Sequence, residues 1–382
     1  MEARDVRALV AGWRYALTNA LLLAFIAALA LGGWPIWAVL AASMLIGGTI
    51  DEAAGDDDER LGSRSRMFVD ANLYVTLPLL VVITCLLFRL VAPPAGATLP
   101  FASLSGLSPQ AGTAPVAAVI TTGYFYALAG ATAAHELTHR VASPLALVSA
   151  RMLLAFILNP TFETYHVHGH HRNVGTYDDP ATARRGEYVL AFVARTVISQ
   201  SIQGWRLEAE RLHRAGTAVW SWRNRVLAGI FCSLAIIATA AWMAGIAGVV
   251  AFLAAAIVGR VFHEMVNYVQ HYGIIRVAGS PVAARHAWDS RRLISNALFY
   301  NLPRHADHHM FAAKPLWQLA AAADSPKLPH GYQTMSLIAL CPPWWRRVVD
   351  PLLADWDVRL ADESERAVVR KRGWTMPERP DA

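Results

Sequence analysis

Six long apolar stretches constrain this chain more than any other feature of its sequence. They cover residues 16–33, 34–50, 71–92, 114–134, 227–243 and 245–270. A helix needs roughly 20 apolar residues to cross the hydrocarbon layer of a membrane, and several of these stretches reach or approach that length. Only 16% of the 382 residues are charged, against about 25% in soluble proteins. The sequence therefore predicts an all-α integral membrane protein with about six transmembrane helices, rather than a soluble protein with a large helical core.

The first apolar stretch is predicted to be a membrane span and not a cleavable signal peptide. No small-residue cleavage site follows it, and the second stretch begins directly after it. Residues 32–35, GGWP, predict a tight turn between the two helices. We expect residues 1–382 to form a single membrane domain.

The distribution of arginine predicts the orientation of the spans. Arginines flank the first pair of stretches and are frequent in residues 140–226, whereas residues 91–115 contain neither Lys nor Arg. The flanking arginines are Arg4, Arg7, Arg14, Arg60, Arg64 and Arg66. By the positive-inside rule, both termini and residues 135–226 are expected in the cytoplasm, with the protein in a bacterial inner membrane. Residues 355–382 are expected to be a charged cytoplasmic tail, with a peripheral helix and a loose end.

Histidine is concentrated in three short windows of the chain. Nine of the 14 histidines lie in residues 135–139, 166–171 and 305–309. Another, His271, lies in NYVQHYG at the predicted cytoplasmic end of the last span. The predicted topology thus brings these clusters to one side of the membrane, although the histidines were not used to derive it.

The spacing of the histidines predicts metal ligands. His135 and His139 are four residues apart and share one helix face, which suits two ligands to one ion. His166 and His170 repeat this spacing, and residues 305, 308 and 309 also share a face. His171 is rotated about 100° from His170 on a helix, which suits a neighbouring ion. His168 would point away from this face, so we predict that it is not a ligand.

Two metal ions bound by about nine histidines explain this pattern better than the alternatives. HELTH at residues 135–139 matches the zinc-protease motif HExxH, but that interpretation leaves seven histidines without a role. A metal transporter or sensor would place its ligands near the middle of the membrane, not at one end of the spans. The three cysteines, at positions 85, 232 and 341, form no CxxC pair, which excludes a rubredoxin-like or zinc-ribbon module.

Four segments then resemble a known family. HELTHR, HVHGHHRNVGTYDDPATAR, NYVQHYG and LPRHADHH are similar to the four histidine boxes of the membrane-bound alkane hydroxylases and xylene monooxygenases, within the fatty acid desaturase superfamily. The resemblance continues through residues 328–351, whereas the N-terminal spans match only in topology. It implies two non-haem iron ions. The implied ligands are His135, His139, His166, His170, His171, His271, His305, His308 and His309.

Two positions depart from the alkane hydroxylase pattern. Those enzymes usually carry Glu before the first histidine of the second box and before the histidine of the NYxxHYG box. Here the residues are Tyr165 and Gln270. Gln270 is more similar to the xylene-oxidising branch, while His271 itself is typical of hydroxylases rather than desaturases. The implied metal ligands are all retained, so the two departures bear on which substrate is used.

The resemblance implies an oxidoreductase of the alkane 1-monooxygenase type. Two irons would use O2, two electrons and two protons to hydroxylate an unactivated C–H group of an apolar substrate from the bilayer. A medium-chain alkane or a methyl-arene is expected. The sequence has no flavin or nicotinamide fingerprint, so a separate rubredoxin or ferredoxin with its reductase is implied as donor. An arginine-rich face suits an acidic donor, membrane lipids are expected partners, and nucleic acid is not.

A fatty acid desaturase, or an oxidative decarboxylase that forms a terminal alkene, is the alternative on the same di-iron scaffold. A fatty acid would need an anion site near the metal. Arg140, Arg172 or Arg304 could supply it.

Several residues near the histidines are candidates for supporting roles. We expect Glu136, Glu264 and Asp307 to orient ligand imidazoles by accepting their second N–H. Asn267, one turn before His271, is expected to form a hydrogen bond near the site, or else a polar contact between helices. Further carboxylate candidates are Glu163, Asp178 and Asp179. The remaining histidines are assigned to packing (His263) or to the surface (His213, His286 and His330).

Overall fold

The computed structural model describes residues 12–57, 66–92 and 112–373. In these ranges all regular structure is helical, and β-type pairing is confined to two isolated bridges. The all-α prediction is therefore confirmed for the described part of the chain. The predictions made from Arg4, Arg7, Arg60 and Arg64, and from most of the loop 91–115, lie outside it.

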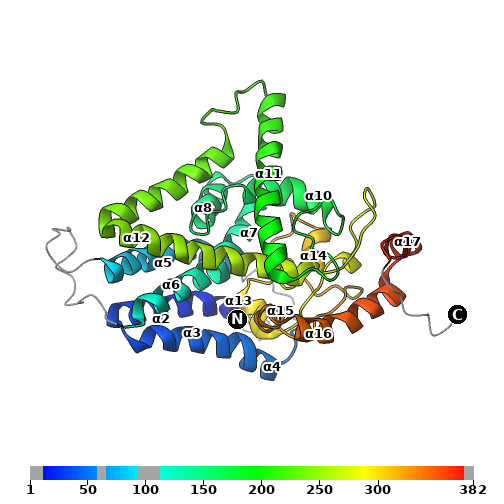
Figure 1. The fold of residues 1–382 in the computed structure, drawn as a ribbon, viewed down its shortest axis with the longest axis horizontal. Coiled ribbons are helices and arrows are strands. Elements are labelled where there is room, and N and C mark those ends of the chain that lie inside the picture. The colour runs from blue at the N-terminus through cyan, green and yellow to red at the C-terminus, as the bar shows by residue number, and fades with distance from the viewer. Residues whose placement is uncertain (1–11, 58–65, 93–111, 374–382) are drawn as a thin grey trace, which may run out of the picture.

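Every predicted apolar stretch forms a helix. The apolar helices are α2 (Ala16–Leu31), α3 (Trp34–Leu45), α5 (Arg66–Val91), α6 (Ala114–Phe125) and α12 (Arg225–His271). Two of them continue through a π-helical turn into a further helix: α3 through η1 (Ile46–Ile50) into α4 (Asp51–Ala54), and α6 through η4 (Tyr126–Ala131) into α7 (Thr132–Thr138). Figure 1 shows these helices lying side by side.

Four of these helical segments are long and apolar enough to cross a membrane, judged by length and composition. They are Trp34–Ala54, Arg66–Val91, Ala114–Thr138 and Arg225–His271. The first predicted span, α2, is apolar but has only 16 residues. The last two predicted spans are the two arms of α12. The count of six crossings stays a prediction.

Gly245 divides α12 into a helical hairpin. Its backbone has φ 58° and ψ −148°, a conformation that essentially only glycine adopts. The chain reverses there, as Figure 1 shows at the end of α12 farthest from α10 and α14. This turn replaces a loop, and it explains why the sequence showed no charged residue between the two stretches.

The segment Ala114–Thr138 is the centre of the bundle. Of its most apolar window, 83% is buried, against 22–39% for the other three candidate spans. It crosses α12 closely at Gly123 and Gly259, where a Cβ on either glycine would collide with the backbone of the other helix. Such small-residue contacts are typical of helices packed in membranes. The outer helices instead expose large apolar side chains such as Leu23, Phe231 and Ile257, as lipid contact requires.

The remaining elements cover one end of the bundle. They are α8 (Pro144–Ala155), α9 (Phe162–Tyr165), η5 (His166–His170), α10 (His171–Asn173), α11 (Val189–Arg214), η6 (Ala284–His286), α13 (Leu293–Leu298), α14 (His305–Met310), η7 (Leu316–Gln318), α15 (Tyr332–Ala339) and α16 (Pro342–Asp355). Figure 1 shows α11 running across the apolar helices and α10 and α14 close to the end of α12.

The C-terminal segment is fixed to this cap as far as α17. It consists of a π-helical turn, η8 (Trp356–Leu360), and α17 (Glu363–Lys371). Trp356 is fully buried, and Asp357 forms a bidentate ion pair with Arg185, with both N–O distances at 2.7 Å. Glu365 accepts a hydrogen bond from His286 at 2.6 Å. The prediction of a peripheral helix is confirmed; residues 374–382 lie outside the described part.

His286 corrects the sequence-based assignment. We predicted a surface residue, but its side chain is 1% exposed between η6 and α17. Its Nδ1 accepts the backbone N–H of Ala283, so that Nε2 donates to Glu365. The contact joins residues that are 79 positions apart, which no local pattern reveals.

Replacing Gly245 should destabilise the fold through backbone strain alone. Nothing lies within 4 Å of a Cβ built at this position, so no collision contributes. For Gly245→Val we expect a cost of about 1–3 kcal/mol and a lower apparent melting temperature in detergent. Ala247→Val, on an exposed helical position two residues away, is the control. Equal melting temperatures for the two variants would contradict this account of the turn.

Candidate metal centre

Nine histidines from four parts of the chain meet at the capped end of the bundle. His135 and His139 come from the end of α7, and His271 is the last residue of α12. The others come from η5 with α10 (166, 170 and 171) and from α14 (305, 308 and 309). Seven of the nine are buried, and His139 and His171 are half-buried. The sequence prediction that these windows converge on one side of the bundle agrees with this arrangement.

Eight of these histidines form two groups with metal-site spacing. The first group is His135, His139, His166 and His308, and the second is His170, His271, His305 and His309. Within each group, one ring nitrogen of every member lies within 4.8 Å of the others. Each group can therefore offer four nitrogen atoms to one ion.

The distances between ring nitrogens fit ligands better than hydrogen bonds. The Nε2 atom of His305 lies 3.0 Å from Nε2 of both His271 and His309. His166 Nε2 lies 3.0 Å from His139 Nε2 and 3.2 Å from His171 Nε2. One ring nitrogen has a single in-plane hydrogen bond to give or accept. Two nitrogens at about 2.1 Å from one ion and at right angles are about 3.0 Å apart, so shared coordination explains the spacing.

His171 joins the first group by its contacts. Its Nε2 atom is 3.2 Å from Nε2 of His166 and 3.1 Å from Nε2 of His308. Both neighbours belong to the first group, so this group has five imidazoles available, whereas the second has four. The structure thus places all nine predicted ligands around two adjacent positions.

A π-helical turn explains how the second histidine box serves both positions. Residues His166–His170 form η5, in which hydrogen bonds join residues five apart. This wider turn places the side chains of His166 and His171 on the same face of the helix, with their Nε2 atoms 3.2 Å apart. Our expectation that His166 and His170 share one ion, from α-helical spacing, is wrong: His166 belongs to the first group and His170 to the second. The prediction that His170 and His171 face different ions agrees with the structure.

His168 lies outside both groups, as predicted. It is exposed, whereas its neighbours His166 and His170 are buried. It forms none of the ring contacts that join the nine. The hexapeptide HVHGHH therefore contains three convergent imidazoles and one that faces away.

The surroundings favour the neutral form of several of these imidazoles. Burial lowers the pKa of His139 to about 3, with a smaller contribution from the nearby His170. Burial and the neighbouring histidines likewise hold the pKa values of His166, His305 and His308 well below the usual range. Neutral imidazole is the form that binds a metal ion. The donor set consists entirely of nitrogen, which suits iron, zinc, copper or nickel.

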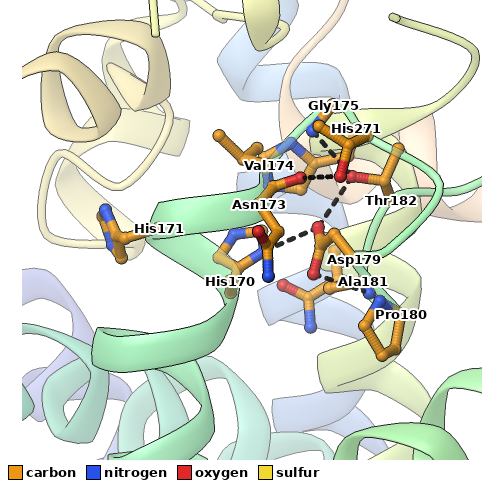
Figure 2. A network of polar contacts seen from close by, with 12 residues as sticks. His170, His171, Asn173, Val174, Gly175, Asp179, Pro180, Ala181, Thr182 and His271 are labelled. Carbon is orange, nitrogen blue, oxygen red and sulfur yellow. Dashed lines mark hydrogen bonds and ion pairs between the residues drawn. The ribbon is translucent and has the colours of Figure 1, made fainter. Parts of the chain in front are cut away.

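Asp179 fixes the orientation of one imidazole. Figure 2 shows His170, whose Nδ1 donates to Asp179 Oδ2 at 2.9 Å, leaving Nε2 free to face the second group. Asp179 also accepts hydrogen bonds from Tyr165 at 2.5 Å and from Thr182 at 2.7 Å. Burial alone would raise the pKa of Asp179, but these partners, His170 first, lower it to about 2. The carboxylate is therefore a fixed acceptor.

The three carboxylates expected to orient ligands have other partners in the described structure. Glu136 pairs with Arg140 at 3.1 Å. Asp307 accepts from Lys314 at 2.5 Å and from the backbone of Ala320 at 2.8 Å. These contacts neutralise buried charge at the edge of the site, so the predicted role of these two as imidazole acceptors is wrong.

Glu264 is likewise engaged away from the imidazoles. It accepts from Gln200 at 2.9 Å and from Asn267 at 3.0 Å, and it pairs with Arg260 at 3.1 Å. Asn267 lines the pocket beside His135, and its amide donates to Glu264 within the same helix, α12, rather than to a second helix. Asp179 was only a further candidate in the sequence, and Tyr165 was noted without a role. The signal available was the position of Asp179 within the second resembling segment and of Tyr165 directly before it.

A small pocket lies directly beside the first histidine group. It is bounded by η4 and α7, which carries His135, by the second arm of α12, and by Phe299 and Leu302, which follow α13. Its lining is mainly apolar: Ala127, Ala131, Phe262, Val266, Phe299 and Leu302. The polar members are Thr132, His135, His263, Asn267 and Gln270. An apolar molecule held there would lie against an imidazole of the first histidine group.

The fold and site define a helical protein with two adjacent groups of histidines, each of which could hold a metal ion, at one end of its apolar helices. Residues 111–339 match the family model for fatty acid desaturases. This is more than half of the chain, which therefore belongs to the fatty acid desaturase family. Together with the apolar helices, this makes it an integral membrane protein.

Three curated relatives narrow the likeness. The chain is 37% identical to alkane 1-monooxygenase 1 of Pseudomonas aeruginosa over 238 residues, which is 61% of this chain and 62% of the relative. It is 33% identical to the alkane 1-monooxygenase of Ectopseudomonas oleovorans over 54% of this chain and 53% of the relative. It is 29% identical to the xylene/toluene monooxygenase hydroxylase component XylM of Pseudomonas putida, over 63% of this chain and 66% of the relative. The chain thus spans less than two thirds of these relatives, and the resemblance to this group is confirmed.

Substitutions within HVHGHH should distinguish the predicted ligands from His168, which is predicted not to bind metal. His166→Ala and His170→Ala each remove a buried imidazole from one group, so we expect loss of bound metal. His168→Ala should retain most of it, because that side chain is exposed. The measurement is metal content per purified chain by mass spectrometry. Equal loss in all three variants would contradict the assignment.

Removing the acceptor for His170 should weaken metal binding without abolishing it. Asp179→Asn replaces a fixed acceptor by an amide that can present an N–H to His170 instead. We expect about 10- to 100-fold weaker metal affinity, typical of a lost partner behind a ligand. Asp178→Asn, on the exposed neighbour, is the control. The affinity is measured by competition with a chelator; identical affinities would show that Asp179 does not orient the ligand.

Proposed function

We propose that this chain is a di-iron monooxygenase that hydroxylates an apolar substrate at an unactivated C–H group. The observation that carries the proposal is the convergence of nine imidazoles, seven buried and two half-buried, on two adjacent positions beside a mainly apolar pocket. The names of the relatives, alkane and xylene monooxygenases, support this choice among the chemistries of the family.

The imidazoles would hold the two irons, which when bound supply the activation of O2. The first group with His171 offers five nitrogens and the second offers four. Asp179 holds His170 in the tautomer whose Nε2 is free for the metal. In the overall reaction one oxygen atom enters the substrate as an alcohol. The other leaves as water, with two electrons and two protons from outside the chain.

The substrate is proposed to come from the bilayer and to be apolar, such as a medium-chain alkane or a methyl-arene. The pocket beside His135 has six apolar lining residues and lies between apolar helices. Its free space is about that of one water molecule, so it would hold the reacting methyl end of the substrate next to the first histidine group rather than the whole molecule. His135 lines the pocket and is also a member of the first histidine group, so the substrate would lie one imidazole away from the first proposed iron.

Electrons are proposed to come from a separate rubredoxin or ferredoxin with its reductase. His139, in the first histidine group, also borders an open cleft at the protein surface. Arg66, Arg140, Tyr74 and Trp317 line the same cleft. A small acidic protein seated there would approach a ligand imidazole directly. We place this face in the cytoplasm, in a bacterial inner membrane, from the arginine distribution of the sequence.

The contacts of two arginines weigh against a fatty acid substrate. Arg140 pairs with Asp70 at 2.6 Å and with Glu136 at 3.1 Å. Arg304 is buried against Asp57 at 2.8 Å. Both were candidates for a carboxylate-binding site, and both serve internal carboxylates. The third candidate, Arg172, is exposed at the surface. We therefore prefer hydroxylation to desaturation or decarboxylation.

Isotope labelling tests the proposed reaction. The iron-loaded protein in lipid nanodiscs is supplied with an electron donor system, 18O2 and, in separate reactions, decane, p-xylene or lauric acid. We expect an alcohol carrying 18O from decane or p-xylene, and none from His305→Ala. Formation of a terminal alkene and CO2 from lauric acid, with no labelled alcohol from the hydrocarbons, would contradict the proposal.

A further inference from the structure

One wall of the pocket beside the histidines is polar. His263, Asn267 and Gln270 occupy positions i, i+4 and i+7 on the second arm of α12, and therefore share one face of the helix. We call these three side chains the polar stripe. Across the pocket lie apolar groups such as Phe299 and Leu302. Polar side chains within membrane helices are costly to retain and typically mark a functional site.

Two members of the polar stripe have hydrogen-bonding capacity without a partner in the described structure. The Nε2 atoms of His263 and of Gln270 are buried and have no partner among the described residues. Gln270 as a whole is only 1% exposed. The nearby hydroxyl of Tyr332 is directed to the backbone oxygen of Trp288, at 3.3 Å. Buried polar groups are nearly always paired, so an unpaired set beside a pocket points to the occupant of that pocket.

The amide of Gln270 allows this wall of the pocket to donate hydrogen bonds. A carboxylate at this position would only accept hydrogen bonds when ionised. An amide also offers two N–H donors. A plain hydrocarbon cannot pair with them, and a site built with such donors selects against a ligand that leaves them unpaired.

We propose that the polar stripe binds an oxygen atom of the substrate, and that the preferred substrate is a largely apolar molecule with a hydrogen-bond-accepting oxygen. An ether, ketone or ester oxygen fits this description. The proposal rests on the proposed function in taking this pocket as the substrate site. It deepens it, because it assigns His263 and Gln270 the role of selecting among apolar molecules.

A binding experiment without turnover tests the proposal. The probes are decane and the series of linear ethers in which one methylene of decane is replaced by oxygen at successive positions. Binding of radiolabelled probe to the iron-loaded protein in lipid nanodiscs is measured by equilibrium dialysis, without reductant. Empty nanodiscs correct for partition into lipid. We expect at least one ether to bind about tenfold tighter than decane, with a dependence on oxygen position.

Variants of the polar stripe identify the donors. Gln270→Met and His263→Phe keep the approximate size of each side chain but remove its hydrogen-bonding atoms, so the preference for the ether should fall toward equality. Ser233→Ala, on the first arm of α12 and bonded to the backbone of Gly229, is the control and should keep it. Melting temperatures and metal content confirm that each variant is folded.

The wild-type measurement alone can overturn the proposal. If no ether binds better than decane after correction for lipid, the polar stripe does not select an oxygen atom. A preference that persists in both variants would also contradict it. Failure of the proposed reaction appears separately, as the absence of 18O-labelled alcohol from decane, because the binding assay requires no oxidation.

Discussion

The cost of burying uncharged imidazoles that face one another is the constraint on which this structure depends. Nine ring systems meet at one end of the bundle with Nε2 atoms about 3 Å apart. In an apolar interior such unpaired nitrogens are unfavourable, and the proposed pair of metal ions would remove the penalty by accepting their lone pairs. The surrounding elements hold these rings in place: α7, η5, the end of α12 and α14 each contribute ligands.

The membrane-type core supplies the rigidity that this arrangement needs. Ala114–Thr138 runs through the centre of the bundle and ends at the first two histidines. It crosses α12 at Gly123 and Gly259, and α12 ends at His271. Two ligand-bearing helix ends are thus fixed to each other by close backbone contact within the apolar region. The pocket between them lies directly beside the first histidine group, because His135 belongs to both.

Local sequence patterns predicted most of the helices and the identity of the convergent histidines. Apolar stretches predicted the helices because burial and lipid contact select the same side chains along a whole turn. Such patterns could not predict how the histidines divide between the two groups. His166 and His170 have ideal α-helical spacing, and only the π-helical turn η5 assigns them to different groups.

The long-range contacts were also beyond the sequence. Nothing local distinguishes Asp179, which binds His170, from Asp178, which is exposed. Glu136 and Asp307 stand next to ligands in the sequence, yet each pairs with a basic side chain instead. The docking of Trp356 and Glu365 onto the cap depends on partners 71 and 79 positions away. Pairing between distant segments is set by the tertiary fold, which one sequence does not specify by inspection.

The central claim is that two irons occupy the two histidine groups, and locating the metal tests it most directly. Anomalous X-ray scattering from crystals of the iron-loaded protein, collected on both sides of the iron absorption edge, identifies the element and its position together. The account predicts two iron peaks, one enclosed by His135, His139, His166 and His308 and one by His170, His271, His305 and His309. A single peak, or peaks that belong to zinc alone, would contradict it.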